Sequence, residues 1–254
     1  MNTKIVAYLT DAHLGQKVVF DGVTGSNKMS YHFEPDEHKN NLKSIFDDIT
    51  KRGITEIVFG GDIGNVETIK WFFDQINTYR FNLSNVLGNH DTFAEVVKYH
   101  KNDLVQGENE MNYTHEDAYI KYIYLDSSAN TVSITQQNWL KEELNTSKKI
   151  MLFIHHPVLD IDTPLDKIGA ALKGKDQLKN LLQGSGKNIT IFCGHYHMED
   201  EKTDKNIRQF LTPAASYQID KRAEIVIVNQ KTFGYRLIEI NKDLVTSQVV
   251  TLSV

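Results

Sequence analysis

The chain is poor in the features that mark exported and membrane-inserted proteins. Its 254 residues include a single cysteine, Cys193, which excludes an intramolecular disulfide and suits a reducing compartment. No apolar run approaches the length of a membrane span. The first apolar stretch, Ile5 to Leu9, is shorter than a signal-peptide core and runs directly into Asp11. We therefore expect a cytoplasmic protein that does not enter a membrane.

An excess of positive charge is also absent. The formal net charge is −5 and the pI is near 6.1, whereas binding to nucleic acid depends on clustered Lys and Arg. The nearest approach to a basic patch is a set of lysines between Lys167 and Lys187, which Asp166 and Asp176 dilute. This set is typical of a solvated helix face. General nucleic-acid binding is therefore not expected.

Strands and helices alternate along the first three quarters of the sequence. Apolar or β-branched content predicts strands over residues 4–10, 56–59, 85–87, 118–125, 150–154 and 189–192. Helical spacing and end signals predict helices over 36–51, 66–79, 93–101, 136–144 and 175–182, with Thr135 capping the fourth. The length leaves one large or two small cores open, and we expect a single domain over residues 1–254.

The C-terminal part is richer in strands. Residues 208–211, 223–228, 234–240 and 244–252 are predicted as successive antiparallel strands, and the polar stretch from Gly15 to Pro35 as a long loop beside the site. An α/β part followed by a β-rich end indicates the α/β class. The expected fold is a four-layer α/β/β/α sandwich of two mixed sheets with flanking helices.

Five short motifs place metal-binding side chains after apolar strands or turns. They are Asp11-Ala12-His13, Gly61-Asp62, Gly88-Asn89-His90-Asp91, His155-His156 and Gly194-His195-Tyr196-His197. Strand ends display functional groups at the carboxyl edge of an α/β sheet, where we expect the metal site. In an extended conformation, Asp11 and His13 would lie on one face and grip one ion, and His195 and His197 repeat this spacing. Alternation would direct His155 and His156 to opposite faces, so only one of them would bind metal.

Each motif also has a structural interpretation. A strand-end Asp commonly caps a turn, an Asn or Asp can cap a helix, and buried histidines are often only hydrogen bonded. Five such motifs in this order would require five separate coincidences. Together they resemble the signature of the calcineurin-like metallophosphoesterase superfamily across residues 11–197, and within it they look most similar to bacterial class III cyclic-nucleotide phosphodiesterases.

The resemblance implies a residue set for two metal ions. It assigns Asp11, His13, Asp62 and His197 to one metal and Asp62, Asn89, His155 and His195 to the other, with Asp62 as the bridge. It makes His90 the catalytic histidine that contacts the phosphoryl group or protonates the leaving oxygen. Many relatives have a carboxylate at the position of Asn65, where it holds this histidine. An Asn there could orient the ring but would stabilise its charged form less.

The chemistry of the set agrees with this assignment independently of the family. Two divalent cations outweigh the two carboxylates and a bridging hydroxide, so the site stays net positive and attracts a phosphoester. Two ions about 3.5 to 4 Å apart can activate the bridging water for attack, and no protein nucleophile is needed. Mixed imidazole, carboxylate and amide ligands suit Mn, Fe or Zn.

We therefore expect a dinuclear metal-dependent phosphodiesterase acting on small phosphodiesters such as cyclic nucleotides. The alternatives are a phosphomonoesterase of the same superfamily, or a catalytically silent binding or scaffold protein on this fold. A nuclease of the double-strand-break repair type fits poorly with the acidic charge. The oligomeric state is open, with a homodimer as one candidate.

Overall fold

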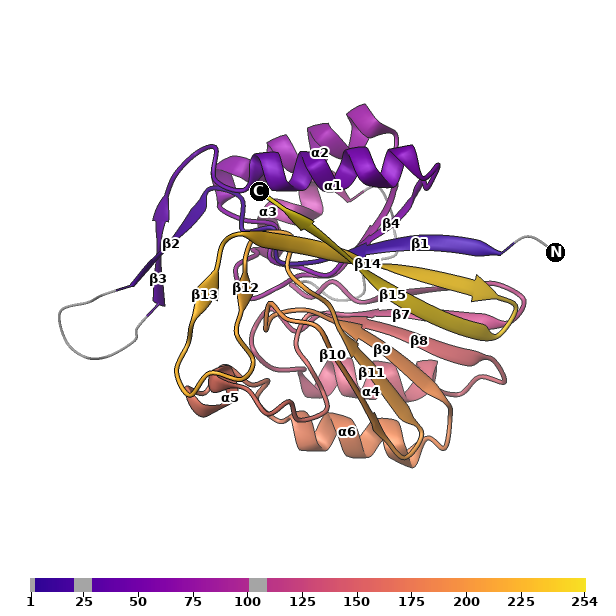
Figure 1. The fold of residues 1–254 in the computed structure, drawn as a ribbon. Helices are drawn as coiled ribbons and strands as arrows, with labels where there is room; N and C mark the ends of the chain where they lie inside the picture. Colours follow the sequence, from indigo (N-terminus) through magenta and orange to yellow (C-terminus); the bar gives the residue numbers. More distant parts are fainter. Residues whose placement is uncertain (1–2, 21–28, 101–108) are drawn as a thin grey trace.

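Two β-sheets pack against each other in the computed structural model, which describes residues 3–20, 29–100 and 109–254 (Figure 1). The first sheet has the order β15-β14-β1-β4-β5. Its strands are β1 (Lys4–Leu9), β4 (Glu56–Phe59), β5 (Asn82–Asn85), β14 (Thr232–Asn241) and β15 (Leu244–Ser253). β1, β4 and β5 run parallel, whereas β14 pairs antiparallel with both β1 and β15, so this sheet is mixed.

The second sheet is also mixed and has the order β10-β11-β9-β8-β7-β6. Its strands are β6 (Tyr113–Glu116), β7 (Ile120–Leu125), β8 (Lys149–Ile154), β9 (Ile189–Cys193), β10 (Asp200–Asp204) and β11 (Ile207–Leu211). The four central strands run parallel, and β6 and β10 pair antiparallel at the two edges. The carboxyl ends of its central strands therefore lie at one edge of the sheet.

Helices cover the outer face of each sheet (Figure 1). Those over the first sheet are α1 (Lys39–Lys51), α2 (Val66–Tyr79) and α3 (Phe93–Val96), the last followed by a 3₁₀ turn, η1 (Val97–Tyr99). α4 (Ile134–Glu143) and α6 (Lys175–Gly184) lie over the second, and α5 (Pro164–Lys167) is a short turn near α6. The expected four-layer sandwich is confirmed. No helix among the described residues is long and apolar enough to cross a membrane.

Aromatic side chains fill the space between the two sheets. The ring of Tyr8 on β1 lies 5.7 Å from that of Phe153 on β8, and Phe153 lies 5.7 Å from Phe192 on β9. All three are buried and belong to one hydrophobic cluster. Burial of such large rings is the main favourable term in packing the sheets, and it holds their carboxyl edges next to each other.

Several element boundaries differ from the prediction for local reasons. β5 ends at Asn85, so Val86 and Leu87 are buried without belonging to a strand. The cap of α4 is Ser133 and not Thr135: the Ser133 hydroxyl accepts the N–H of Gln136, whose side chain accepts the N–H of Ser133 in return. The helix predicted over 93–101 ends earlier, and its last residue lies outside the described residues.

The C-terminal prediction is wrong in two places. Of residues 223–228 only Val228 is in a strand, the short β13 (Val228–Asn229), which pairs with β12 (Gln218–Ile219). β11 also does not pair with the strands predicted after it: it lies in the second sheet, antiparallel to β10 and parallel to β9. The β14–β15 hairpin is antiparallel as predicted.

A β-hairpin occupies part of the segment predicted as a loop. β2 (Gln16–Phe20) and β3 (Met29–Phe33) pair antiparallel, and residues 21–28 lie outside the described residues. The glycines of this segment precede β2 or fall between the strands, so they obscured two short runs of strand-forming residues.

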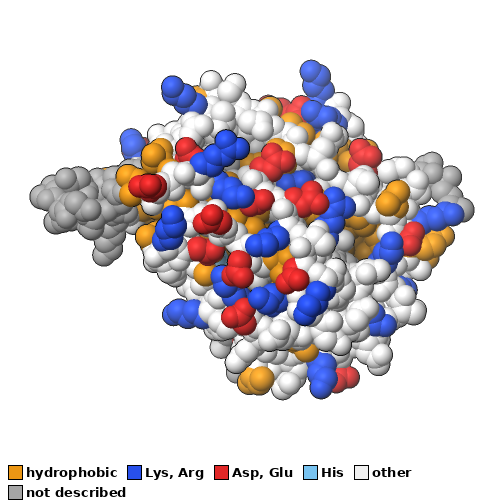
Figure 2. Space-filling view, turned by 60° about the horizontal axis from the view of Figure 1, so that its bottom comes forward, with side chains coloured by type: hydrophobic (Ala, Val, Ile, Leu, Met, Phe, Trp, Pro, Cys, Tyr) orange, Lys and Arg blue, Asp and Glu red, His pale blue; other side chains and the backbone are white. Residues whose placement is uncertain are grey.

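Charges of both signs alternate on the face that carries α5 and α6 (Figure 2). Lys175 pairs with Asp160 at 2.6 Å and Lys179 with Asp176 at 3.0 Å. The lysines of this region therefore form a mixed, solvated surface and not a basic patch, as the sequence indicated.

Candidate metal centre

The five motifs meet where the carboxyl ends of the two sheets lie together. Asp11 and His13 follow β1, Asp62 follows β4, His155 follows β8, and His195 and His197 follow β9. Asn89 and His90 lie in the segment after β5. Residues far apart in the sequence thus converge at the carboxyl edge predicted for the site.

The backbone turns sharply at these positions. Asp11, His13, Asp62, His195 and His197 all have positive φ angles, between 42° and 71°. Non-glycine residues rarely adopt this left-handed conformation, and it concentrates at functional sites. The extended geometry predicted for Asp11 and His13, and for His195 and His197, is therefore wrong. Each pair converges through two left-handed residues and not through strand alternation.

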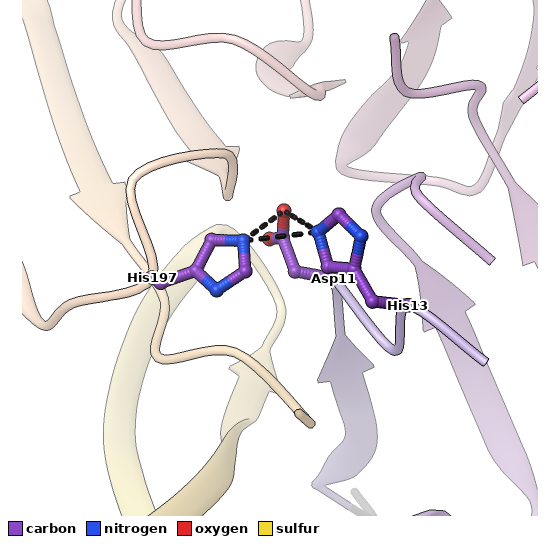
Figure 3. Close-up of side chains that lie close together, drawn as sticks. All are labelled: Asp11, His13 and His197. Carbon is purple, nitrogen blue, oxygen red and sulfur yellow. Dashed lines mark hydrogen bonds and ion pairs between the residues drawn. The ribbon is translucent and has the colours of Figure 1, made fainter. Parts of the chain in front are cut away.

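The first candidate ligand group consists of Asp11, His13 and His197 (Figure 3). One ligand atom from each residue lies within 4.8 Å of the other two. Nε2 of His197 is 3.3 Å from Oδ1 of Asp11 and 3.1 Å from Nε2 of His13. All three side chains are buried, so a carboxylate and two ring nitrogens face one another away from solvent.

The second candidate group consists of Asp62, His155 and His195. Oδ2 of Asp62 lies 3.3 Å from Nε2 of His155 and 3.5 Å from Nε2 of His13. A single carboxylate oxygen therefore faces a histidine of each group. This is the position that a bridging ligand between two ions requires.

Each histidine of these groups uses its other ring nitrogen to hold its orientation. The acceptors are Gln16 Oε1 for His13 (2.7 Å), the Gly60 carbonyl for His155 (2.8 Å), the Ala170 carbonyl for His195 (2.9 Å) and the Tyr217 carbonyl for His197 (3.0 Å). An N–H donated to oxygen leaves the opposite nitrogen with a free lone pair, which is the usual arrangement of metal-binding histidines. His195 would therefore bind through Nδ1 and the other three through Nε2.

A buried oxygen of Asn89 supports the fit of a metal ion. Oδ1 of Asn89 makes no hydrogen bond to any described residue. Burying an unsatisfied polar atom costs roughly 1–3 kcal/mol, so native structures rarely leave one without a partner. Asn89 lines the same pocket as Asp62 and His195, and a cation bound beside them would satisfy this oxygen.

His156 has a different environment from His155. Its Nδ1 lies 2.8 Å from Ser127 Oγ and its Nε2 lies 3.0 Å from Asn130 Oδ1, so both ring nitrogens are engaged. Burial lowers the pKa of His156 well below its usual value, and the ring packs 4.2 Å from that of His195. It therefore supports a candidate ligand without being one.

The charges of the site favour a cation. Burial would raise the pKa of Asp11, but the imidazoles of His197 and His155 hold it well below the usual range. Burial likewise would lower the pKa of His155, yet Asp62 and Asp11 raise it to about 10. Burial, with a contribution from His155, lowers the pKa of His195 to about 4. The carboxylates of Asp11 and Asp62 therefore favour positive charge in the site, which the ring of His155 carries in the metal-free protein.

Further carboxylates and glycines position the candidate ligands. Asp91 accepts the backbone N–H groups of Asp62, Ile63 and Gly88 at 2.7 to 2.9 Å, which ties two motifs together. Burial and the neighbouring charge of Asp62 raise the pKa of Asp91 to about 7. A Cβ at Gly194 would overlap Thr10 and the Asp11 carboxylate. These contacts explain why the motifs need Asp and Gly beside the ligands.

Sequence reasoning missed the residue that contacts His90. Asn65 caps α2 by accepting the N–H of Glu67 at 3.0 Å, and no described hydrogen bond joins it to His90. Nδ1 of His90 instead lies 3.2 Å from Nε2 of Gln16 on β2. His90 also donates its backbone N–H to Oδ1 of Asp62 at 2.7 Å. Nothing in the local sequence marks Gln16, because the contact spans 74 residues.

A pocket of about 360 Å³ opens over the two ligand groups. Its remaining walls are mostly apolar and come from Met29, Tyr31, Leu165, Ile168, Ala170, Ala171 and Ile219, with Asn130 and Lys173 among the polar residues. The segment from Gly15 to Pro35, which was expected beside the site, contributes Met29 and Tyr31 to these walls. Tyr217 lies next to the pocket, where its hydroxyl is 2.8 Å from that of Tyr31.

Comparison with known proteins gives a consistent picture. Residues 29–230 match the calcineurin-like phosphoesterase superfamily domain. A probable glycerophosphodiester phosphodiesterase of Arcobacter nitrofigilis is 28% identical over 88% of this chain and 85% of its own length. A probable cyclic nucleotide phosphodiesterase of Fibrobacter succinogenes is 25% identical over 83% of this chain and 84% of its own length.

Solved structures share the fold at low sequence identity. A dimetal phosphatase of Danio rerio superposes with a TM-score of 0.63 at 12% identity, covering 98% of this chain and 99% of its own. GAP50, described as the anchor in the inner membrane complex of Plasmodium, reaches a TM-score of 0.59 at 14% identity, covering 98% of this chain and 84% of its own. Because an anchor and a phosphatase share this architecture, the fold alone does not determine activity.

Proposed function

Because the chain belongs to the calcineurin-like phosphoesterase superfamily, we propose that it is a dinuclear metal-dependent phosphodiesterase that hydrolyses small organic phosphodiesters such as cyclic nucleotides. The observation that carries the proposal is the position of Asp62, whose Oδ2 faces His13 at 3.5 Å and His155 at 3.3 Å. Such a carboxylate can join two cations in one buried site.

We assign the ligands by adding Asp62 to the first group and Asn89 to the second, as the family resemblance implies. Asp11, His13, Asp62 and His197 would hold one ion, and Asp62, Asn89, His155 and His195 the other. Two ions bound there would activate the nucleophile and supply the positive charge that stabilises a phosphoryl transition state. The donors combine imidazole nitrogen, carboxylate oxygen and an amide oxygen, which suits Mn, Fe or Zn.

His90 has the role of the catalytic histidine in this proposal. Its ring lies at the edge of the first ligand group, with a centroid 4.8 Å from that of His13, and it lines the pocket. It would donate a proton or a hydrogen bond to a phosphoryl or leaving oxygen, a role that typically contributes about 10²- to 10⁴-fold to the rate.

The pocket and the relatives support a small diester as substrate. A volume of about 360 Å³ is in the range of small-molecule sites, and its largely apolar wall suits an organic substituent better than a second phosphate. The relatives are named as glycerophosphodiester and cyclic nucleotide phosphodiesterases. We place the protein in the cytoplasm, where its buried Cys193 would stay reduced.

A phosphomonoesterase is the second candidate, because the same ligand sets serve monoester hydrolysis. The Danio rerio neighbour is described as a dimetal phosphatase, although it shares only the fold. A silent scaffold is disfavoured by the completeness of the ligand set, in which all seven positions hold metal-competent side chains.

The deciding experiment combines metal analysis with paired substrates. The purified protein, reconstituted with Mn, should bind two ions by plasma mass spectrometry and cleave bis-p-nitrophenyl phosphate faster than p-nitrophenyl phosphate. The reverse order of rates would indicate a monoesterase. Absence of both bound metal and Mn-stimulated cleavage would refute the proposal.

A further inference from the structure

Gln16 lies between a candidate metal ligand and the candidate catalytic histidine. Its Oε1 is 2.7 Å from Nδ1 of His13, and its Nε2 is 3.2 Å from Nδ1 of His90. The side-chain amide of Gln16 therefore contacts Nδ1 of both His13 and His90. It offers its oxygen as an acceptor to His13 and its NH₂ group as a donor to His90.

The surrounding structure holds this amide in place. The backbone N–H of Gln16 donates to the carbonyl of His13 at 3.0 Å, which closes a turn directly before β2. Tyr31, on the paired strand β3, stacks on His13 with centroids 5.3 Å apart and meets His90 edge-on at 4.8 Å. The Tyr31 hydroxyl in turn contacts that of Tyr217 at 2.8 Å. The hairpin thus packs both rings around the amide.

Metal ligation determines the direction of the two hydrogen bonds. A His13 that binds metal through Nε2 must carry its proton on Nδ1, so Nδ1 donates and the amide oxygen must face it. The amide nitrogen then faces His90 and donates to it, which requires a lone pair on Nδ1 of His90. The ring proton of a neutral His90 is consequently on Nε2.

We propose that Gln16 is a positioning residue that couples the tautomers of His13 and His90, and so presents the catalytic histidine to the substrate as an Nε2–H donor. The inference rests on the proposed function. A carboxylate in the same place would offer two acceptors and would draw a proton to Nδ1 of His90. The amide instead keeps that proton on the nitrogen left free for a phosphoryl or leaving oxygen.

Two variants separate the two hydrogen bonds. Gln16→Glu keeps an acceptor for His13 but removes the donor to His90, whereas Gln16→Leu removes both. Lys17→Gln is the matched control, because Lys17 is the next residue of β2, is exposed, and its replacement changes the net charge by the same amount and sign as Gln16→Glu.

The primary measurement is the position of the His90 ring proton. Zinc-loaded, ¹⁵N-histidine-labelled protein is diamagnetic, and a long-range ¹H–¹⁵N correlation spectrum distinguishes protonated from unprotonated ring nitrogens, with His90→Asn providing the assignment. The wild type and Lys17→Gln should show the proton on Nε2. Gln16→Glu should show a protonated Nδ1, and Gln16→Leu should show a mixture.

Metal affinity and kinetics give independent readouts. Gln16→Glu should retain wild-type zinc affinity while kcat for bis-p-nitrophenyl phosphate falls about 10- to 100-fold with KM within about twofold. Gln16→Leu should also bind zinc about 10- to 100-fold more weakly, because His13 loses its acceptor. A wild-type His90 protonated on Nδ1, or a Gln16→Glu protein with unchanged tautomer and kcat, would overturn the inference. Failure of zinc to bind the wild type would instead refute the proposed function.

Discussion

Replacing Asp62 by Asn tests the bridging carboxylate with the smallest possible change of shape. The Asn side chain keeps an oxygen to accept the N–H of His90, which Asp62 now accepts at 2.7 Å, but it removes the negative charge between the two groups. Oδ2 of Asp62 lies 3.5 Å from a ligand nitrogen of one group and 3.3 Å from a ligand nitrogen of the other, so we take about 4 Å as the distance over which its charge would act on each ion. At that distance and an effective dielectric constant of about 20, a carboxylate attracts a divalent ion by ~8 kcal/mol.

The expected loss is smaller than the full attraction, because the amide oxygen remains a dipolar ligand. If the substitution removes half of the ~8 kcal/mol attraction, each ion binds about 4 kcal/mol more weakly, which lowers its affinity about a thousandfold. Equilibrium dialysis with metal analysis should therefore show that Asp62→Asn loses both ions at concentrations that saturate the wild type.

Asp126→Asn is the matched control for this experiment. Asp126 is buried and accepts backbone N–H groups of Met111 and Ser128 at 2.9 and 2.8 Å, but it belongs to neither ligand group. This variant should keep both ions. If Asp62→Asn retained one ion at wild-type affinity, Asp62 would serve one site only and the bridging argument would fail.

Three further predictions address proton linkage, backbone packing and helix capping. The pKa of His155 is about 10 in the metal-free protein, because Asp62 and Asp11 outweigh the effect of burial. The ring is thus protonated below that pH and must lose its proton to bind metal, so apparent metal affinity should rise about tenfold per unit between about pH 6 and 9. Calorimetry in buffers of different ionisation enthalpy should detect the released proton, and a pH-independent affinity would contradict the assignment. Gly194→Ala should lower the free energy of unfolding in urea by ~1–3 kcal/mol, since its Cβ overlaps neighbouring atoms. Gly184→Ala, in open space on α6, should raise that free energy by up to about 1 kcal/mol, and equal effects of the two would refute the steric argument. Ser133→Ala should cost ~0.5–2 kcal/mol by the same assay because it removes the α4 cap, whereas Thr135→Ala should stay within about 0.5 kcal/mol; a larger loss for Thr135 would restore the original cap assignment.

Local sequence signals predicted the buried elements well. β4 and α2 have the predicted bounds, because a compact apolar run and a regular helical spacing are strong local signals. The hairpin β2–β3 was missed because its pairing depends on a tertiary surface, formed in part by His13, His90 and Tyr217. The strand predicted over residues 223–228 is wrong for the same reason, since an apolar run forms a strand only where the edge of a partner strand is available.

By itself, the sequence determined the class of fold and the chemical types of the candidate ligands, because strand periodicity and the motifs are local properties of the chain. Only the tertiary structure decided how those ligands are shared between the two groups and how their side chains are oriented. It placed one oxygen of Asp62 between two histidines, engaged both nitrogens of His156, and assigned Gln16 rather than Asn65 to His90. These outcomes depend on left-handed turns and on contacts between residues far apart in the sequence, and no local pattern encodes them.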